Sequence, residues 1–236
     1  SWGMTALIVG ARKEAGGGVR EGWSVFRGTQ NLVGLFSFED NTTPKPEEIL
    51  DKRGIFDDYN GKCNYQITTG VVGNFDTEGW GVIKYTNLTS TGEPGQDVLW
   101  VDTDFPLFRL GDVYLMYAEA VARGGEGGDI NTAVGYVNEL RDRAYGETPH
   151  NKIDAAWLTA NNYQNILDER GRELYWEGVR RIDLIRFGKY TSSSYTWPAK
   201  GGVITGVGVN ERYNIFPIPI SDISVNGSLE QNEGYK

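Results

Sequence analysis

The feature that most limits how this chain can fold is the hydrophobic pattern that begins at Pro106. From Leu110 to Val121, apolar residues recur at the three- and four-residue spacing of an amphipathic helix, and Gly124-Gly125 ends the run. A second helix is predicted to follow Asp129, because aspartate is a favoured N-cap residue, and to end at Gly146. The middle of the chain is therefore predicted to be helical.

The two predicted helices form an antiparallel pair with small residues at their contact, similar to the helix pairs of tetratricopeptide-type repeats. A single pair does not establish a repeat, and the sequence shows no clear second copy. A longer helix is predicted over residues 160–177 with Thr159 as its N-cap, and Gly178 is its weak point. A further helical segment, Val179 to Phe187, is closed by Gly188.

The rest of the chain is rich in glycine and aromatic residues and only weakly periodic. Two short strands are expected there, Leu32–Phe38 and Trp80–Tyr85. A short helix is expected at Pro46–Asp51, and the rest is expected to form long loops. We therefore predict a mainly α protein with a loop-rich aromatic region over 1–105, a helical region over 106–190 and an extended C-terminal segment over 191–236. The apolar residues of the C-terminal segment are expected to be buried against the helices, although Pro217 and Pro219 keep it extended.

Charge and cysteine content exclude several classes of function. The formal net charge is −9 and no run of Lys and Arg exceeds two residues, so binding to nucleic acid is disfavoured. Cys63 is the single cysteine, so neither an internal disulfide nor a thiolate metal cage is expected. No apolar stretch reaches the length of about 20 residues that a membrane span needs. The opening at Ser1 is interpreted as a start inside a longer protein.

The sequence offers no evident catalytic constellation. His150 is the one histidine, and a Gly-x-Ser-x-Gly elbow is absent. A glycoside hydrolase needs two enclosed carboxylates about 5 to 10 Å apart, and no such pair is identifiable. We therefore expect no enzyme activity, no cofactor and no metal.

Acidic residues at spacing four, Glu169, Glu173 and Glu177, form a stripe that repels itself unless cations neutralise it. Arginines interleave with these acids, which favours a structural role. Arg170, Glu173, Glu177 and Arg181 are expected to be partly buried, each with a partner of opposite charge. Helical ion pairs are expected between Glu177 and Arg181 and between Asp168 and Arg172.

Four motifs in order resemble the SusD/RagB family. The tail closes on a proline-flanked segment and a Gln-Asn-x-Gly-Tyr end, with Glu233 and Gly227 where proline is usual and Asp222 where glutamate is usual. The upstream motifs are similar to the family's helices. They are Phe105-Pro106-Leu107-Phe108-Arg109 leading to Ala118-Glu119-Ala120, Val137-Asn138-Glu139-Leu140-Arg141, and Glu169-Arg170-Gly171-Arg172-Glu173-Leu174 with Glu177-Gly178-Val179-Arg180-Arg181-Ile182-Asp183-Leu184-Ile185-Arg186-Phe187-Gly188.

The resemblance covers about residues 46–236 and implies a C-terminal portion of a family member, with the N-terminal half missing. It implies a non-catalytic surface lipoprotein of the bacterial outer membrane, whose lipid anchor lies outside this chain. Such proteins hold an oligosaccharide or another nutrient and deliver it to a SusC-like TonB-dependent transporter. The alternative is a helical-repeat scaffold that binds protein and has no sugar site.

A glycan site needs aromatic platforms beside forked polar groups, held by loops on a rigid support. The Gly-rich N-terminal region supplies such residues, and by its distance from the Arg109 helix it matches the place where the family carries ligand aromatics. The candidate carbohydrate-binding residues are Trp2, Trp23, Trp80, Arg20, Arg27 and Asn31.

Overall fold

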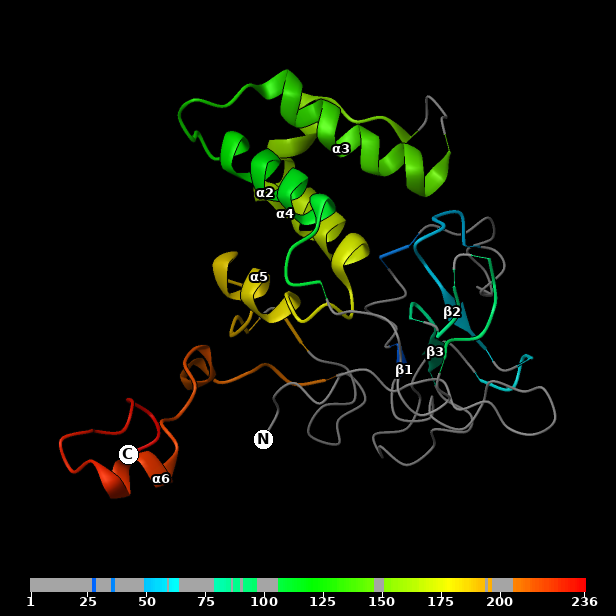
Figure 1. Ribbon diagram of the computed structural model, residues 1–236. Coiled ribbons are helices and arrows are strands. Elements are labelled where there is room, and N and C mark those ends of the chain that lie inside the picture. Colours follow the sequence, from blue (N-terminus) through cyan, green and yellow to red (C-terminus); the bar gives the residue numbers. More distant parts are fainter. Residues whose placement is uncertain are drawn as a thin grey trace.

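The computed structural model describes most of the second half of the chain and separate parts of the first half. The described residues are 27–28 (backbone only), 35–36, 49–58, 60–63, 79–85, 87–89, 91–96, 106–146, 151–193, 195–196 and 206–236. Within them the chain is mainly helical, as the sequence predicts, with a small sheet and an irregular C-terminal segment (Figure 1).

Helices α2 (Leu110–Ala122) and α3 (Ile130–Tyr145) form the predicted pair, joined by a short loop. The side chain of Asp129 accepts a hydrogen bond from the Thr132 amide, which confirms it as the N-cap. Both helices pack against α4 (Ala155–Leu174), and the three lie together at one end of the molecule (Figure 1). Their shared core contains Leu115, Val137, Leu158 and Ile166.

Helix α4 is kinked, and its N-cap is not the predicted one. Its first turn begins after Asp154, whose side chain accepts a hydrogen bond from the Trp157 amide at 2.9 Å. Thr159 instead donates to the carbonyl of Ala156. The helix is interrupted from Ala160 to Tyr163, where three residues take left-handed φ values. The prediction that Thr159 caps this helix is therefore wrong, because the helix starts one turn earlier.

We expect Asp154→Ala to lower the free energy of unfolding by about 1 kcal/mol, because the first turn of α4 loses its side-chain acceptor. Thr159→Ala should change stability by only a few tenths of a kcal/mol, since Thr159 caps nothing. Urea denaturation followed by circular dichroism compares the two variants. Equal losses for both would contradict this assignment.

After α4 the chain turns through Tyr175 and Trp176 into the short helix α5 (Arg180–Arg186), which ends at Gly188 as predicted. Trp176 and Gly178 both take positive φ values, 65° and 79°, so the predicted weak point at Gly178 lies inside a true break between the helices. Helix α5 packs against α4.

The sheet is small, antiparallel and three-stranded, in the order β1-β3-β2. Its central strand β3 (Trp80–Val82) lies within the predicted strand Trp80–Tyr85. Strands β1 (Arg27–Gly28) and β2 (Phe56–Asp57) flank it and were not predicted. Residues 35–36 form a turn, and residues 49–51 are not helical. The remaining residues of the predicted strand Leu32–Phe38 and helix Pro46–Asp51 lie outside the described part.

A second core joins this sheet to the end of α4. Trp80 and Val82 of β3, Phe56 of β2 and Phe36 are buried together with Tyr175. The Phe56 and Tyr175 rings stack with centroids 5.9 Å apart, and Phe36 contacts both rings edge-on. The sheet is thus attached to the helices through the residue that immediately follows α4.

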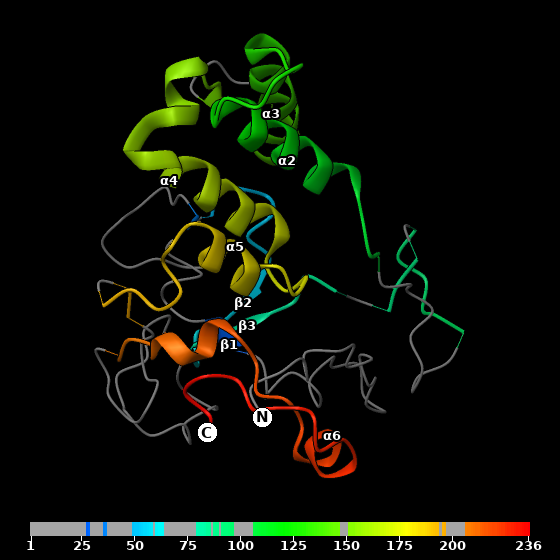
Figure 2. The ribbon, with the colours of Figure 1, turned by 90° about the vertical axis from the view of Figure 1, so that its left-hand side faces the viewer.

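The C-terminal segment, 206–236, folds mainly on itself and contains α6 (Ile220–Val225). The Gln231 side chain bonds to both backbone groups of Ile218, and the Tyr235 hydroxyl donates to the carbonyl of Ile215. Both views show the end that carries α6 pointing away from the α2–α3 pair (Figures 1 and 2).

Burial of this segment against the helices was predicted, and the structure contradicts it. Ile215 is 63% exposed and Leu229 is 36% exposed, while Ile218 and Ile223 are only half-buried. Several of its backbone carbonyls, those of Ile215, Phe216 and Ile218, accept hydrogen bonds from side chains of the same segment. Its contact with α5 runs through Arg181, which donates to the carbonyls of Tyr213 and Asn214 and lies over the Phe216 ring.

Candidate functional site

Most residues predicted to bind carbohydrate lie outside the described part of the chain. These are Trp2, Arg20, Trp23 and Asn31, and for Arg27 only the backbone is described, as part of β1. Trp80 is described, and it is 2% exposed. It lies on the central strand of the sheet with its ring 6.2 Å from that of Phe56. A buried indole cannot present a face to a sugar, so the prediction for Trp80 is wrong.

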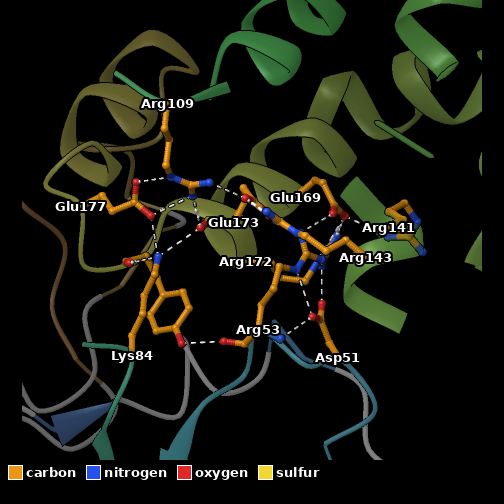
Figure 3. Close-up of polar contacts among 11 residues, drawn as sticks. Asp51, Arg53, Lys84, Arg109, Arg141, Arg143, Glu169, Arg172, Glu173 and Glu177 are labelled. Carbon is orange, nitrogen blue, oxygen red and sulfur yellow. Dashed lines mark hydrogen bonds and ion pairs between the residues drawn. The ribbon is translucent and has the colours of Figure 1, made fainter. Parts of the chain in front are cut away.

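The most unusual described feature is a buried cluster of charges at the junction between the helices and the sheet, which we call the junction network (Figure 3). The network takes its carboxylates from α4, from the turn after it and from the segment before β2, and its cations from five parts of the chain. Its members are Asp51, Glu169, Glu173 and Glu177 with Arg53, Lys84, Arg109, Arg141, Arg143 and Arg172.

Glu169 lies at the buried centre of the junction network, with a side chain that is 0% exposed. Its two oxygens accept from Arg53 at 2.8 Å, from Arg141 at 2.9 Å and from Arg172 at 2.7 Å. Arg53 also holds Asp51 through a forked pair of bonds at 2.9 and 2.7 Å. Arg53 therefore fixes the segment before β2 to the C-terminal part of α4.

Glu173, one turn further along α4, binds three arginines. Arg53, Arg109 and Arg143 donate to it at 3.0, 2.6 and 2.5 Å. Arg109 precedes α2, so this carboxylate joins the start of α2 to α3 and to the Arg53 segment. Helices α3 and α4 and the residue that precedes α2 thus meet at one buried side chain.

Glu177 completes the network beyond the end of α4. It accepts from Arg109 at 2.7 Å and from Lys84, which follows β3, at 2.5 Å. The Lys84 ammonium also donates to the carbonyls of Glu173 and Tyr175 and lies 4.4 Å from the centre of the Tyr175 ring. Lys84 therefore satisfies the free carbonyls at the C-terminal end of α4 and ties them to the sheet.

Local backbone features make this arrangement possible. A Cβ atom at Gly111 would lie 2.7 Å from both Arg109 Nη1 and Glu173 Oε1, so only glycine leaves room for that ion pair. A Cβ atom at Gly171 would lie 2.8 Å from Leu35 and 3.0 Å from Arg180. These two helical glycines are explained by close packing rather than by backbone flexibility.

Burial and ion pairing oppose each other in the pKa values of the two central carboxylates. Burial raises the pKa of Glu169, but the guanidinium groups of Arg172, Arg53 and Arg141 outweigh it and lower the value to about 2. Burial likewise raises the pKa of Glu173, and hydrogen bonds from Arg143 and Arg109 lower it to about 2. Both groups are therefore ionised at neutral pH and are poor proton donors there.

The prediction that Arg170, Glu173, Glu177 and Arg181 are partly buried, each with a partner of opposite charge, is confirmed for the first three. Arg170 is 4% exposed and pairs with Asp112 and Asp183, while Glu173 and Glu177 are paired as described. Arg181 differs, because it bonds to backbone carbonyls and has no ion pair with a carboxylate among the described residues.

The two predicted helical ion pairs do not form. Glu177 lies beyond the break after Leu174, so it is not one turn from Arg181 on a common helix. Arg172 bonds to Glu169 rather than to Asp168, which accepts from Gln164 instead.

Sequence reasoning missed most of the cations that neutralise the stripe. Arg53, Lys84, Arg141 and Arg143 are distant in sequence, and nothing in local spacing connects them with Glu169 or Glu173. The sequence did indicate that cations must lie nearby, because three like charges at helical spacing repel one another unless they are neutralised. It indicated that partners exist, but not which ones.

In the described part of the chain, the buried charged side chains pair with one another. No three His, Cys, Asp or Glu side chains lie together there as metal ligands would. No helix in the same part of the chain is long and apolar enough to cross a lipid bilayer. The fold and the junction network define a mainly helical protein in which buried ion pairs attach a small antiparallel sheet to a group of helices.

Comparison with known proteins identifies the family. The model of the SusD family matches residues 10–235, so the chain belongs to that family. The resemblance noted in the sequence is confirmed, and so is the mainly helical SusD-like fold.

Two curated relatives and one solved structure illustrate the match. The chain is 41% identical over 186 residues to the starch-binding protein SusD of Bacteroides thetaiotaomicron, covering 79% of this chain and 31% of that protein. It is 31% identical over 135 residues to the SusD-like protein P25 of Formosa agariphila, covering 55% of this chain and 24% of that protein. A SusD superfamily protein from Bacteroides vulgatus superposes with a TM-score of 0.52 at 21% identity, covering 89% of this chain and 44% of that structure. The chain thus spans about a third or less of the curated relatives it matches.

Proposed function

We propose that this chain is part of a surface glycan-binding protein that holds an oligosaccharide without transforming it. The observation that carries the proposal is the 41% identity to a protein whose name states starch binding. That identity extends over 79% of this chain, so it includes residues of the described helical part. An α-glucan of the starch type is accordingly the first ligand to test.

The junction network supports passive binding. Its central carboxylates, Glu169 and Glu173, each accept from three arginines. Carboxylates that act as general acids need a raised pKa, whereas both of these have a pKa near 2. These two groups therefore hold the protein together and are unsuited to hydrolysis.

The cellular role that we propose follows family membership. The whole protein would be a lipoprotein on the outer face of the outer membrane, with its lipid attached outside this chain. It would deliver its ligand to a SusC-like TonB-dependent transporter. Co-purification of such a transporter with the tagged protein from detergent-solubilised outer membranes supports this role, and reproducible absence of any transporter contradicts it.

Isothermal titration calorimetry with maltohexaose tests the proposed ligand class. We expect reversible binding, with no reducing sugar released above a heat-inactivated control. Cellohexaose, which has the same sugar units in a different linkage, is the matched comparison. Binding of neither oligosaccharide by the full-length protein contradicts the α-glucan proposal, and release of product contradicts passive binding.

The binding residues remain a proposal for the N-terminal region. We expect Trp23→Ala or Trp2→Ala to weaken binding by roughly 1–3 kcal/mol, about 5- to 150-fold in Kd, because each loses an aromatic platform. Arg20, Arg27 and Asn31 are proposed as the polar groups beside that platform. Trp80→Phe is the control, since Trp80 is buried, and its Kd should match that of the parent protein. Unchanged binding by both alanine variants would place the site elsewhere.

A helical scaffold that binds protein is the second candidate, and one observation favours it. Helix α2 exposes apolar side chains along one face, including Leu110 and Val113. Exposed apolar faces of this kind mark contact surfaces.

A further inference from the structure

The sequence contains two Asn-Gly pairs, Asn60-Gly61 and Asn226-Gly227, and both asparagines are exposed. An asparagine that precedes glycine can lose ammonia without an enzyme, because the next amide nitrogen can attack the side-chain carboxamide. Glycine has no Cβ atom to hinder that attack. The proposed function uses neither pair, and the structure places the two in different surroundings.

Asn226 directly follows α6 and begins an exposed turn. Its amide donates to the carbonyl of Asp222, and its own carbonyl accepts from the Leu229 amide at 3.0 Å. The Ser228 amide donates to the Asn226 side-chain oxygen Oδ1 at 3.1 Å. This bond draws electrons from the carboxamide carbon and closes a ring that contains the Gly227 nitrogen. Both reacting atoms therefore belong to one small turn.

Gly227 supplies an unobstructed nucleophile. Within the described part of the chain, its amide nitrogen donates no hydrogen bond. A Cβ atom at this position would meet nothing within 4 Å beyond its chain neighbours. The space beside the nitrogen is therefore open, and no hydrogen bond has to break at the nitrogen before it reacts.

The other pair is held more firmly. Asn60 and Gly61 have φ values of 60° and 74°, which are those of a tight turn with two consecutive left-handed residues. That turn lies between β2 and the buried Cys63, whose amide donates to the carbonyl of Asp58 at 3.0 Å. Ring closure requires the peptide that follows the asparagine to rotate, and this turn is fixed at both ends.

We propose that Asn226 is a site of spontaneous deamidation and isoaspartate formation. The Gly227 nitrogen loses its proton to solvent base and forms a bond to Cγ of Asn226. The Cγ–Nδ2 bond breaks, and the departing nitrogen takes up a proton and leaves as ammonia. Water then opens the succinimide ring. Cleavage of the new Cγ–N bond gives aspartate, and cleavage of the original peptide C–N bond gives isoaspartate.

Both products disturb the end of α6. A carboxylate at position 226 lies one turn from Asp222 and beside the carbonyl end of the helix, and both positions are unfavourable for negative charge. Isoaspartate also adds a methylene group to the main chain and displaces the turn closed by Leu229. That turn connects α6 to Gln231, whose side chain bonds both backbone groups of Ile218. The modification therefore loosens the segment around α6, and it is independent of glycan binding.

Peptide mapping by mass spectrometry tests the proposal on the full-length protein that contains this chain, after incubation at pH 9 and at pH 6. We expect the peptide that contains Asn226 to gain about 1 Da, and to gain it faster at pH 9, because base removes the Gly227 proton. Isoaspartyl methyltransferase with S-adenosylmethionine should label the same peptide. The Asn60 peptide should gain this mass about tenfold more slowly or less, since its reaction requires local opening.

Gly227→Pro is the matched variant, because proline has no amide proton to lose. The Gly227 amide donates no hydrogen bond within the described residues and its φ is not left-handed, so proline fits there. This variant should lose the mass gain at Asn226 and keep that at Asn60. Gly227→Ala, the second variant, should slow the gain by about tenfold. The proposal is overturned if the Asn226 peptide of the parent gains no mass, if both pairs react equally, or if the gain persists in Gly227→Pro.

Discussion

Replacement of Glu173 by alanine is expected to lower the free energy of unfolding by about 3–5 kcal/mol, which is the cost of breaking a buried ion pair from one side. The side chain is 1% exposed and accepts from Arg53, Arg109 and Arg143. Its removal leaves Arg53, itself only 10% exposed, without one of its partners. The variant should also lose the ion pairs that link Arg109, Arg143 and Arg53 through this residue, while the apolar core between α2 and α3 remains.

Urea denaturation at pH 7, followed by circular dichroism and tryptophan fluorescence, measures this loss. The matched control is Glu233→Ala, because that side chain is 94% exposed and its ion pair with Lys236 is long, at 3.7 Å. Surface ion pairs of this kind contribute little, so the control should stay within about 0.5 kcal/mol of the parent. Equal stabilities of the two variants would show that the junction network does not stabilise the fold.

The second large effect is a loss of stability in acid. Glu169 and Glu173 have folded-state pKa values of about 2, below their ordinary value of 4.5. A carboxylate whose pKa is lower in the folded state stabilises the protein fully above pH 4.5. That contribution is lost as the pH falls towards 2. The lowered pKa corresponds to a contribution of roughly 3 kcal/mol to the free energy of unfolding for each group. The two groups together contribute less than twice that amount, because both bind Arg53.

The measurement is the urea midpoint at several pH values between 7 and 2, for the parent and for the double variant Glu169→Gln, Glu173→Gln. The parent should lose stability steeply below pH 4.5. The double variant should be less stable at pH 7 and show a shallower fall, because its two amides do not titrate. A double variant of the exposed residues, Glu230→Gln and Glu233→Gln, should follow the parent. Parallel curves for the parent and the Glu169 and Glu173 double variant would show that other groups cause the acid transition.

These two predictions concern the same structural role. The helices have one core, around Leu115 and Val137, and the sheet has another, around Phe56 and Trp80. Between them the described contacts are largely ionic, with the stacked ring of Tyr175 and its hydroxyl bond to the Arg53 carbonyl at the boundary. Ion pairs with forked geometry fix relative orientation more strictly than apolar contacts do. We expect the junction network to set how the loop-rich region is presented relative to the helices.

The sequence by itself determined the pair of helices α2 and α3 and the family. The three- and four-residue periodicity located α2, and Asp129 and Gly146 marked the ends of α3, because caps and breaks depend on nearby residues. The charge stripe on α4 also indicated that Glu169 and Glu173 need cations. The four ordered motifs were sufficient to recognise the SusD family, since they are linear patterns.

Only the tertiary structure decided which cations those are, where Trp80 lies and how the C-terminal segment folds. Arg53 and Lys84 reach α4 from far away in the sequence, and no periodic pattern encodes such contacts. Trp80 is buried because the rings of Phe56, Phe36 and Tyr175 form a core with it, and those residues come from parts of the chain that local sequence does not connect. Whether an indole is buried in a core or exposed to a ligand depends on what packs around it, which is a property of the assembled fold and not of the residue.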